Sequence, residues 1–182
     1  IKGDILKVLP DVKNFKVAAN IPYYLTSRLL RILLEKRPRP NLIVLTMQKE
    51  VAQRITAQPP KMNLLALSVQ TFGRPEIIKA VPASCFWPKP KVDSAIIKIT
   101  NLPIDFFTEK SLETEKFFQI TKTAFGQKRK LLTSSLVKIV PKGSLKQILK
   151  ETGINPRARP EELSLDQWSK IILGIEKISA KP

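Results

Sequence analysis

The sequence contains no histidine and only one cysteine among its 182 residues. The absence of histidine excludes catalytic triads built on imidazole and metal sites that use histidine ligands. The lone Cys85 excludes an internal disulfide and a cysteine-cluster zinc site, and we expect it to be an apolar packing residue without a chemical role. No signal peptide opens the sequence, so this cysteine usage favours a reducing cytoplasm.

Long apolar runs and acidic side chains are also scarce. No stretch of about 18 consecutive apolar residues occurs, so we expect no segment to span a bilayer. Lys and Arg number 32 against 15 Asp and Glu, which gives a net charge of +17 and a pI near 10.2. A surplus of this size favours polyanionic partners, RNA or DNA first, with an anionic membrane surface as the rival.

Strand and helix patterns alternate in the first part of the chain. The run 41–47 is continuously apolar and β-branched, which is typical of a strand covered on both faces, and 16–19 is expected to be a short buried strand. The expected strands are 16–19, 41–47, 76–81 and 94–100, and the expected helices are one that ends before Arg37, 49–55, and 63–72 closed by Gly73. This order predicts an α/β sheet with an antiparallel edge.

After about residue 108 the sequence predicts helices only. Apolar residues in 117–125 follow helical spacing, Ser144 is expected to begin a helix that Gly153 ends, and Ser164 with Gln167 forms a capping box before the last helix. We therefore expect two domains, 1–108 with the sheet and 109–182 as a small all-helical domain.

A basic tract lies inside this helical part. Residues 116–150 include nine Lys or Arg and no Asp or Glu. Lys128, Arg129 and Lys130 directly follow the 117–125 helix, and phosphate contacts of such a tract hold duplex RNA by its shape. Lys49 and Arg54 are expected to continue this path. A solvated surface is the alternative for any single charge.

Asn20-Ile21-Pro22-Tyr23, directly after a predicted strand, is the strongest functional signal. Open α/β sheets bind ligands at the carboxyl ends of their strands. The Asn20 amide oxygen and the Ile21 carbonyl can accept the two N–H groups of a base's exocyclic amine, and Pro22 keeps Ile21 extended. Tyr23 offers a ring on which an extruded base can stack. The alternative is a turn in which Asn20 caps locally and Tyr23 fills the core.

Motifs along the whole chain resemble those of the ribosomal RNA adenine N6,N6-dimethyltransferases of the kasugamycin-resistance (KsgA) type. The matching stretches are Gly3-Asp4, NIPYYLTS at 20–27, MQKEVAQRI at 47–55, LSVQ at 67–70, VPASCFWPKPKVDSAIIKI at 81–99, AFGQKRKLL at 124–132 and INPRARPEELSL at 154–165. The resemblance implies the C-terminal part of a class I (Rossmann-like) methyltransferase sheet followed by a helical RNA-binding domain. It also implies methyl transfer from S-adenosylmethionine to two adjacent adenosines near the 3′ end of small-subunit rRNA.

The resemblance assigns roles to individual residues. Asp4 matches the position that holds the cofactor's adenine amino group, and Asn20 matches a residue that touches both the cofactor and the target. Phe86 matches an aromatic on the far side of the target-base pocket, although it could equally be a core anchor. Lys89 and Lys91 flank Pro90 near the expected pocket mouth and could meet the target strand's backbone. We expect Asp93 to be a turn or strand-end partner rather than a catalytic acid.

One family feature is missing from the sequence. Family members carry a Gly-rich loop after the first strand and an acidic residue that binds the cofactor ribose, and both would precede Ile1. None of the six glycines here forms a GxGxG pattern. We therefore expect an N-terminally truncated chain that binds S-adenosylmethionine poorly and is inactive alone, with strand 16–19 at an unpaired edge. The parent protein would be the enzyme, a cytoplasmic monomer acting on the small ribosomal subunit precursor.

Three alternatives remain open at this point. A macrolide-resistance dimethyltransferase of large-subunit rRNA shares Asn-Ile-Pro-Tyr, but the stretches PKPKVDSA and RPEELSL favour the small-subunit type. A DNA adenine methyltransferase is less favoured, because those usually carry Asp/Asn-Pro-Pro-Tyr. A non-catalytic basic RNA-binding assembly factor is supported by the missing cofactor loop.

Overall fold

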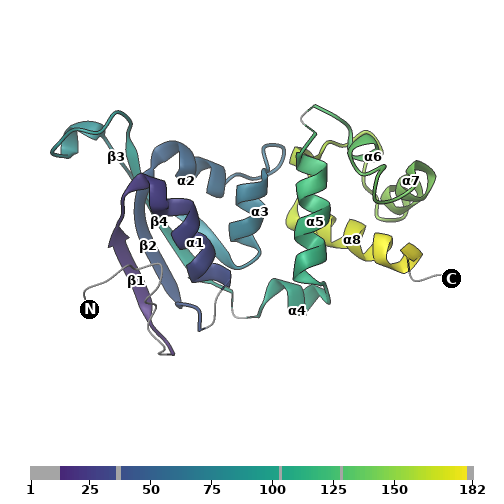
Figure 1. The fold of residues 1–182 in the computed structure, drawn as a ribbon, viewed down its shortest axis with the longest axis horizontal. Helices are drawn as coiled ribbons and strands as arrows, with labels where there is room; N and C mark the ends of the chain where they lie inside the picture. Colours follow the sequence, from purple (N-terminus) through teal and green to yellow (C-terminus); the bar gives the residue numbers. More distant parts are fainter. Residues whose placement is uncertain (1–12, 36–37, 103, 128, 180–182) are drawn as a thin grey trace. The chain divides into compact units, whose positions relative to one another are not determined.

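The computed structural model describes residues 13–35, 38–102, 104–127 and 129–179. Contacts divide the chain into two compact units. The first comprises Ile1–Thr56 and Phe72–Pro103, and the second comprises Ala57–Thr71 and Ile104–Pro182. The described part of the first unit holds a sheet with short helices, whereas that of the second is helical (Figure 1).

Four strands form the sheet of the first unit in the order β1-β2-β4-β3. These are β1 (Lys16–Asn20), β2 (Leu42–Gln48), β3 (Gly73–Val81) and β4 (Ser94–Asn101). β1 pairs in parallel with β2, whereas β4 pairs antiparallel with both β2 and β3. The expected α/β sheet with an antiparallel edge is confirmed.

Short helices follow the two parallel strands. The 3-10 turn η1 (Tyr23–Leu25) leads directly into α1 (Thr26–Glu35), and α2 (Lys49–Ile55) follows β2 without a loop. A second 3-10 turn, η2 (Ala83–Cys85), lies between β3 and β4. Apolar side chains of α1, β2, α2 and β4 form the core of the unit: Leu29, Leu30, Leu33, Leu34, Ile43, Leu45, Met47, Ala52, Ile55, Ala95, Ile97 and Ile99.

The burial of two strands differs from the sequence-based expectation. The apolar pattern predicts that β1 is buried, but its residues alternate between exposed and half-buried. It pairs with β2 alone among the described strands, so it lies at the edge of the described sheet, where the sequence places it. In β2 one face is buried and the other is half-buried, so the strand is not fully covered on both faces. An apolar run indicates that a strand could be buried, but its actual burial depends on the elements that pack against it.

β3 lies at the other edge of the described sheet and contains a glycine and a proline. Gly73 begins β3 and does not close the preceding helix, which ends at Gln70. A Cβ atom on Gly73 would lie 2.6 Å from the Cγ2 atom of Ile99, so the glycine allows the two strands to meet. Pro75 lacks an N–H group, which an edge strand tolerates.

The second unit is helical throughout its described residues. Its helices are α3 (Leu64–Gln70), α4 (Phe106–Lys110), α5 (Thr114–Phe125), α6 (Leu132–Ser135), α7 (Lys142–Glu151), the 3-10 turn η3 (Pro160–Glu162) and α8 (Leu165–Ser179). The expected helix from Ser144 begins two residues earlier, because Pro141 is well suited to precede a helix. The sequence-based prediction lacks α4, whose signal is Asp105: its carboxylate accepts the N–H of Phe107.

Aromatic side chains dominate the core of this unit. Phe106, Phe107 and Phe117 meet edge to face, with ring centroids 5.4 to 5.8 Å apart. Trp168 on α8 is fully buried, and its ring lies 5.9 Å from that of Phe125. Such pairs add to the stabilisation that burial of apolar area already gives.

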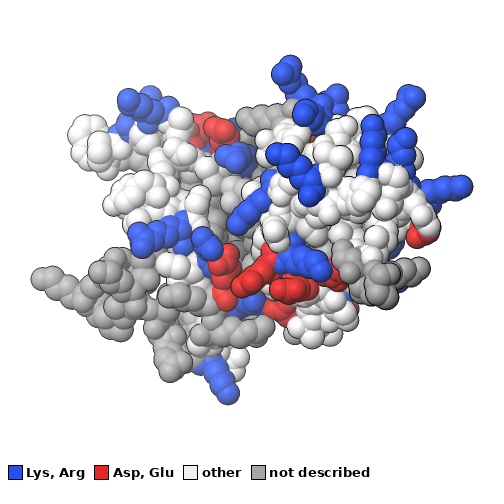
Figure 2. All heavy atoms as spheres, turned by 45° about the vertical axis from the view of Figure 1, so that its right-hand side comes forward, with Lys and Arg blue, Asp and Glu red and all other residues white. Residues whose placement is uncertain are grey.

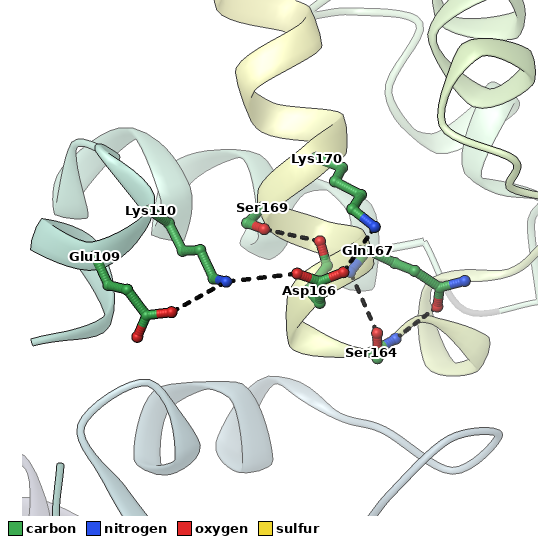
Figure 3. A network of polar contacts seen from close by, with 7 residues as sticks. All are labelled: Glu109, Lys110, Ser164, Asp166, Gln167, Ser169 and Lys170. Carbon is green, nitrogen blue, oxygen red and sulfur yellow. Dashed lines mark hydrogen bonds and ion pairs between the residues drawn. The ribbon is translucent and has the colours of Figure 1, made fainter. Parts of the chain in front are cut away.

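The beginning of α8 carries the predicted capping box. The Gln167 N–H donates to the Ser164 hydroxyl at 3.2 Å, and the Ser164 N–H donates to the Gln167 side chain at 3.0 Å. Asp166, in the same turn, lies 2.9 Å from the Lys170 ammonium and 3.6 Å from that of Lys110 (Figure 3). The acidic side chain near the helix N-terminus also interacts favourably with the helix dipole.

The two units do not coincide with the expected domain boundary. The first unit ends at Pro103, and the segment Ala57–Thr71 groups with the second unit although it lies between β2 and β3 in sequence. The division into 1–108 and 109–182 remains a sequence-based prediction. Among the helices of the described residues, none combines the length and apolar character that crossing a membrane requires.

Candidate active site

Four segments meet at one end of the sheet. β1 and β2 run in parallel with Asn20 opposite Thr46, so their carboxyl ends are neighbours. Ser94, the first residue of β4, lies opposite Gln48 on one side and Val81 on the other. The strand ends therefore bring together residues 20–23, the beginning of α2, the end of β3 and the beginning of β4. This is the edge at which open α/β sheets bind ligands.

The Asn20-Ile21-Pro22-Tyr23 segment leaves the sheet in an extended conformation. Asn20 is the exposed last residue of β1, and Pro22 has φ −55° and ψ 135°. The Pro22 carbonyl accepts the N–H of Leu25 at 3.0 Å. Within the described part of the chain, no hydrogen bond engages the Asn20 side chain or the Ile21 carbonyl. This leaves both oxygens available, as the predicted role requires; that role remains a prediction.

Tyr23 is tied to the sheet by its hydroxyl. The Tyr23 oxygen lies 2.7 Å from the Ser94 hydroxyl oxygen, and Ser94 is fully buried. The Tyr23 ring is half-buried, whereas the neighbouring Tyr24 is 83% exposed. Sequence reasoning missed Ser94, and nothing in its immediate sequence identifies it as a partner of Tyr23.

Asp93 holds the turn that precedes Phe86. Its carboxylate accepts the N–H of Ala83, the first residue of η2, at 3.0 Å. The same carboxylate lies 3.9 Å from the Lys49 ammonium, and the Asp93 carbonyl accepts the Lys49 N–H. The expectation that Asp93 is a strand-end partner is confirmed. Phe86 follows η2 and is half-buried.

A cleft of about 470 Å³ lies at this end of the unit. It is lined by Gln48, Lys49, Glu50, Gln53, Ala83, Lys91, Val92 and Asp93. Two predicted RNA-binding residues, Lys49 and Lys91, are among them, whereas Asn20, Tyr23 and Phe86 are not. The structure thus groups part of the predicted site around one polar cleft and places the Asn20–Tyr23 segment beside the same strand ends.

The remaining predicted residues are distributed over the chain. Arg54, in the last turn of α2, and Lys89 are exposed. Arg129 and Lys130 are exposed after α5, and Arg129 has φ 70°. Asp4 and Lys128 lie outside the described residues. The expectation that Cys85 is a packing residue is wrong: the residue is exposed, and no residue of η2 is buried.

No group of metal-ligating side chains occurs among the described residues. The candidate site instead offers amide, carbonyl, aromatic and ammonium groups, which suit an organic ligand with N–H donors and phosphates.

The comparisons with known proteins identify the family. The model of the family described as ribosomal RNA adenine dimethylase matches residues 1–177. The chain belongs to this family. The ribosomal RNA small subunit methyltransferase A of Dehalococcoides mccartyi strain CBDB1 is 40% identical over 180 residues, covering 95% of this chain. That of Rippkaea orientalis is 42% identical over 195 residues, covering 98% of this chain and 71% of the relative.

Solved structures of dimethylases and related enzymes share the fold. A dimethyladenosine transferase from Plasmodium falciparum superposes with a TM-score of 0.80 at 25% identity, covering 98% of this chain and 72% of that chain. The 23S rRNA methyltransferase ErmE superposes with a TM-score of 0.76 at 22% identity, covering 97% and 71%. The expected Rossmann-like methyltransferase sheet followed by helices is confirmed. The chain spans 61% of the length of the Dehalococcoides relative.

Proposed function

We propose that the protein containing this chain transfers methyl groups from S-adenosylmethionine to N6 of two adjacent adenosines near the 3′ end of small-subunit rRNA. The observation that carries the proposal is the Asn20–Tyr23 segment at the carboxyl edge of the sheet in a ribosomal RNA adenine dimethylase chain. Its partner would be the small ribosomal subunit or its precursor. We further propose that the protein is a monomer and that it is cytoplasmic; the single unpaired cysteine supports the cytoplasmic location.

The target amine is held by two oxygens in this proposal. The Asn20 amide oxygen accepts one N–H of the adenine N6 amine and the Ile21 carbonyl accepts the other. Two acceptors on one amine favour a tetrahedral nitrogen with a localised lone pair, which is the form that attacks an electrophilic carbon. The methylated nitrogen loses one N–H proton, which water can take because Asn20 is exposed. No imidazole base is needed, in agreement with the absence of histidine.

The aromatic residues would hold the extruded base. Tyr23 supplies a ring fixed through its hydroxyl to Ser94, so the ring can stack on a base without first losing conformational freedom. Phe86 would cover the opposite side of the base. Phe86 directly follows η2, and the hydrogen bond from the Ala83 N–H to the Asp93 carboxylate fixes the beginning of η2.

The residues at this edge also fit the cofactor. The Asn20 amide offers a donor and an acceptor at a strand end, where ligands of this fold bind. When bound, S-adenosylmethionine supplies an electrophilic methyl group. Asp4, which the family resemblance assigns to the cofactor's adenine, lies outside the described residues.

Transfer of a second methyl group adds a constraint on the two acceptors. After the first transfer only one N–H remains on the nitrogen, so either the Asn20 oxygen or the Ile21 carbonyl must release its partner. Asn20 is exposed and its side chain can rotate, whereas the Ile21 carbonyl is restrained by Pro22. We therefore assign the release to Asn20.

Substitution of Asn20 tests the proposal. In full-length protein that carries this chain, Asn20→Ala should nearly abolish methyl transfer to isolated small ribosomal subunits and leave RNA affinity almost unchanged. Asn155→Ala is a suitable control, because Asn155 is an exposed asparagine in the second unit whose side chain accepts the Arg157 N–H. Equal losses of transfer and RNA binding in Asn20→Ala would contradict the assigned role. Transfer to large rather than small subunits would contradict the proposed substrate.

A further inference from the structure

Three lysines form a row on one side of α7. Lys142, Lys146 and Lys150 are spaced four residues apart, so they project from the same side of the helix, and all three are exposed. The other side of α7 buries Leu145, Ile148 and Leu149. With a rise of about 1.5 Å per residue, the row is about 12 Å long.

No carboxylate of the described residues forms an ion pair with this row. Glu151 is the acidic residue nearest in sequence, and its carboxylate accepts a hydrogen bond from the Gln147 side chain at 2.9 Å. The whole stretch 116–150 contains no acidic residue. No carboxylate of the described residues therefore neutralises the three ammonium groups.

The row is unfavourable for α7 itself. Like charges four residues apart repel each other along a helix. Lys142 is the first residue of α7, and the first turn contains no acidic side chain, so a cation lies at the end that favours anions. Helix formation alone does not account for this arrangement, whereas an external polyanion would turn each charge into a favourable contact.

The backbone beneath the row is firmly placed. Ile148 packs against Gly174 of α8, where a Cβ atom would lie 2.7 Å from the Ile148 Cγ2 atom. The absence of a Cβ atom at Gly174 leaves room for the Ile148 side chain at this contact. The three lysine stems thus project from a helix whose position is set by the core, which reduces the entropy lost when a long ligand binds.

Three other lysines of the same unit have carboxylate partners. Lys110 and Lys170 lie on either side of Asp166 (Figure 3), and Lys116 lies 3.4 Å from Glu176. Figure 2 shows projecting Lys and Arg side chains at the upper right of the molecule, with acidic side chains gathered mainly elsewhere on this face. Other described lysines of the unit, such as Lys122 and Lys138, also form no ion pair, but Lys142, Lys146 and Lys150 share one side of a single helix.

We propose that the α7 lysine row (Lys142, Lys146 and Lys150) binds the phosphate backbone of RNA. The contact is independent of base sequence. The row lies within the basic tract 116–150 but is separate from Arg129 and Lys130, the described residues of that tract for which the sequence predicts RNA binding. This inference rests on the proposed function only in naming RNA as the polyanion. A row of point charges matches repeated phosphates, and each neutralised phosphate releases counterions.

The salt dependence of RNA binding tests this proposal. In full-length protein, the triple variant Lys142→Gln/Lys146→Gln/Lys150→Gln should bind a mixed-sequence RNA hairpin more weakly, on the order of 10- to 100-fold at physiological salt. The slope of log affinity against log salt concentration should become shallower by about 2 to 3. The triple variant with arginine at the same positions should retain both values, because the charge is kept.

A matched triple variant removes the same charge elsewhere. Lys110→Gln/Lys116→Gln/Lys170→Gln also lowers the net charge by three, but from lysines with carboxylate partners. The proposal predicts a much smaller change in slope for this control. An equal change in both triple variants, or no change in the α7 variant, would overturn it. Loss of binding to phosphatidylserine vesicles with unchanged RNA affinity would assign the row to a membrane surface and overturn it too.

The result is separable from that of the methylation test. If the full-length protein fails to methylate rRNA but the α7 variant loses RNA affinity as described, the α7 proposal is supported and the proposed reaction is contradicted. If transfer is normal and the salt slope of the α7 variant is unchanged, the proposed reaction is supported and the α7 proposal is contradicted. Circular dichroism of the α7 variant should match the parent, because its three substituted side chains are exposed. The control variant is compared in the same way, because Lys110 and Lys116 are half-buried.

Discussion

The hydroxyl of Tyr23 lies 2.7 Å from the hydroxyl of Ser94, although 71 residues separate them in sequence. Ser94 is fully buried and is paired on both sides, with Gln48 of β2 and Val81 of β3. Its position is therefore fixed by three strands of the sheet. Through this one bond, the segment that carries the proposed base-stacking ring is held by the sheet and not by its own turn alone.

Removal of either hydroxyl should weaken methyl transfer modestly. A net hydrogen bond between neutral groups contributes about 0.5–1.5 kcal/mol, so we expect Tyr23→Phe and Ser94→Ala each to lower kcat/KM by about 2- to 10-fold. Because the two residues act through one bond, kcat/KM of the double variant should be little lower than that of the less active single variant. Steady-state transfer to small ribosomal subunits by the four proteins provides the measurement.

Tyr24→Phe is the matched control for this cycle. Tyr24 is the next residue and carries the same hydroxyl, but it is 83% exposed, so its loss should leave transfer unchanged. Additive losses in the Tyr23 and Ser94 variants would show that the two hydroxyls act independently and would remove the assigned role of Ser94.

The sequence alone was sufficient to place Asn20 and Tyr23 at the carboxyl edge, because a polar segment directly after a parallel strand can lie nowhere else. It could not pair Tyr23 with Ser94. That contact depends on β4 inserting between β2 and β3, so that its first residue arrives at the same edge. The order of strands along a chain does not fix their order in a sheet.

Burial was the less predictable property. The apolar character of 16–19 suggested a buried strand, but its residues alternate between exposed and half-buried. The surroundings of Cys85 suggested a packed thiol, but the residue is exposed. The spacing of Lys142, Lys146 and Lys150 is visible in the sequence. Whether a carboxylate faces such a row is decided by tertiary packing, and the pairing of Lys116 with Glu176 shows that distant acids can do so.

Two helical glycines should respond in opposite ways to alanine. A Cβ atom added to Gly143 in α7 would have no neighbour within 4 Å, whereas one added to Gly174 would lie 2.7 Å from Ile148. Alanine is favoured over glycine within a helix by about 0.8–1.0 kcal/mol, so Gly143→Ala should raise the free energy of unfolding by up to about that amount. Gly174→Ala adds an overpacking cost of about 1–3 kcal/mol and should be neutral or destabilising. Urea denaturation monitored by circular dichroism compares them.

Shortening Ile148 provides the control for the second glycine. In an Ile148→Ala background the space beside Gly174 is open, so Gly174→Ala should become stabilising, as Gly143→Ala is. If Gly174→Ala remains equally destabilising there, contact with Ile148 is not the reason for the glycine.

The stability of α8 should depend on pH through Asp166. The hydrogen bond from Lys170 holds the pKa of the Asp166 carboxyl below its ordinary value, with smaller favourable effects from Lys110 (Figure 3). A lowered pKa in the folded protein stabilises it above the ordinary aspartate pKa, and this contribution is lost as pH falls through the folded pKa. Because the side chain is half exposed, solvent screens the pairs and the contribution is about 0.3–1 kcal/mol.

Asp166→Asn should therefore lower the free energy of unfolding at pH 7 by about this amount, and the difference should shrink below about pH 4. Urea denaturation of both proteins across this range is the measurement. Lys170→Gln removes the main partner, so in that background the Asp166→Asn substitution should cost less at pH 7. A deficit of Asp166→Asn that persists unchanged at the lowest pH would mean that the shape of the side chain, and not its charge, stabilises the beginning of α8.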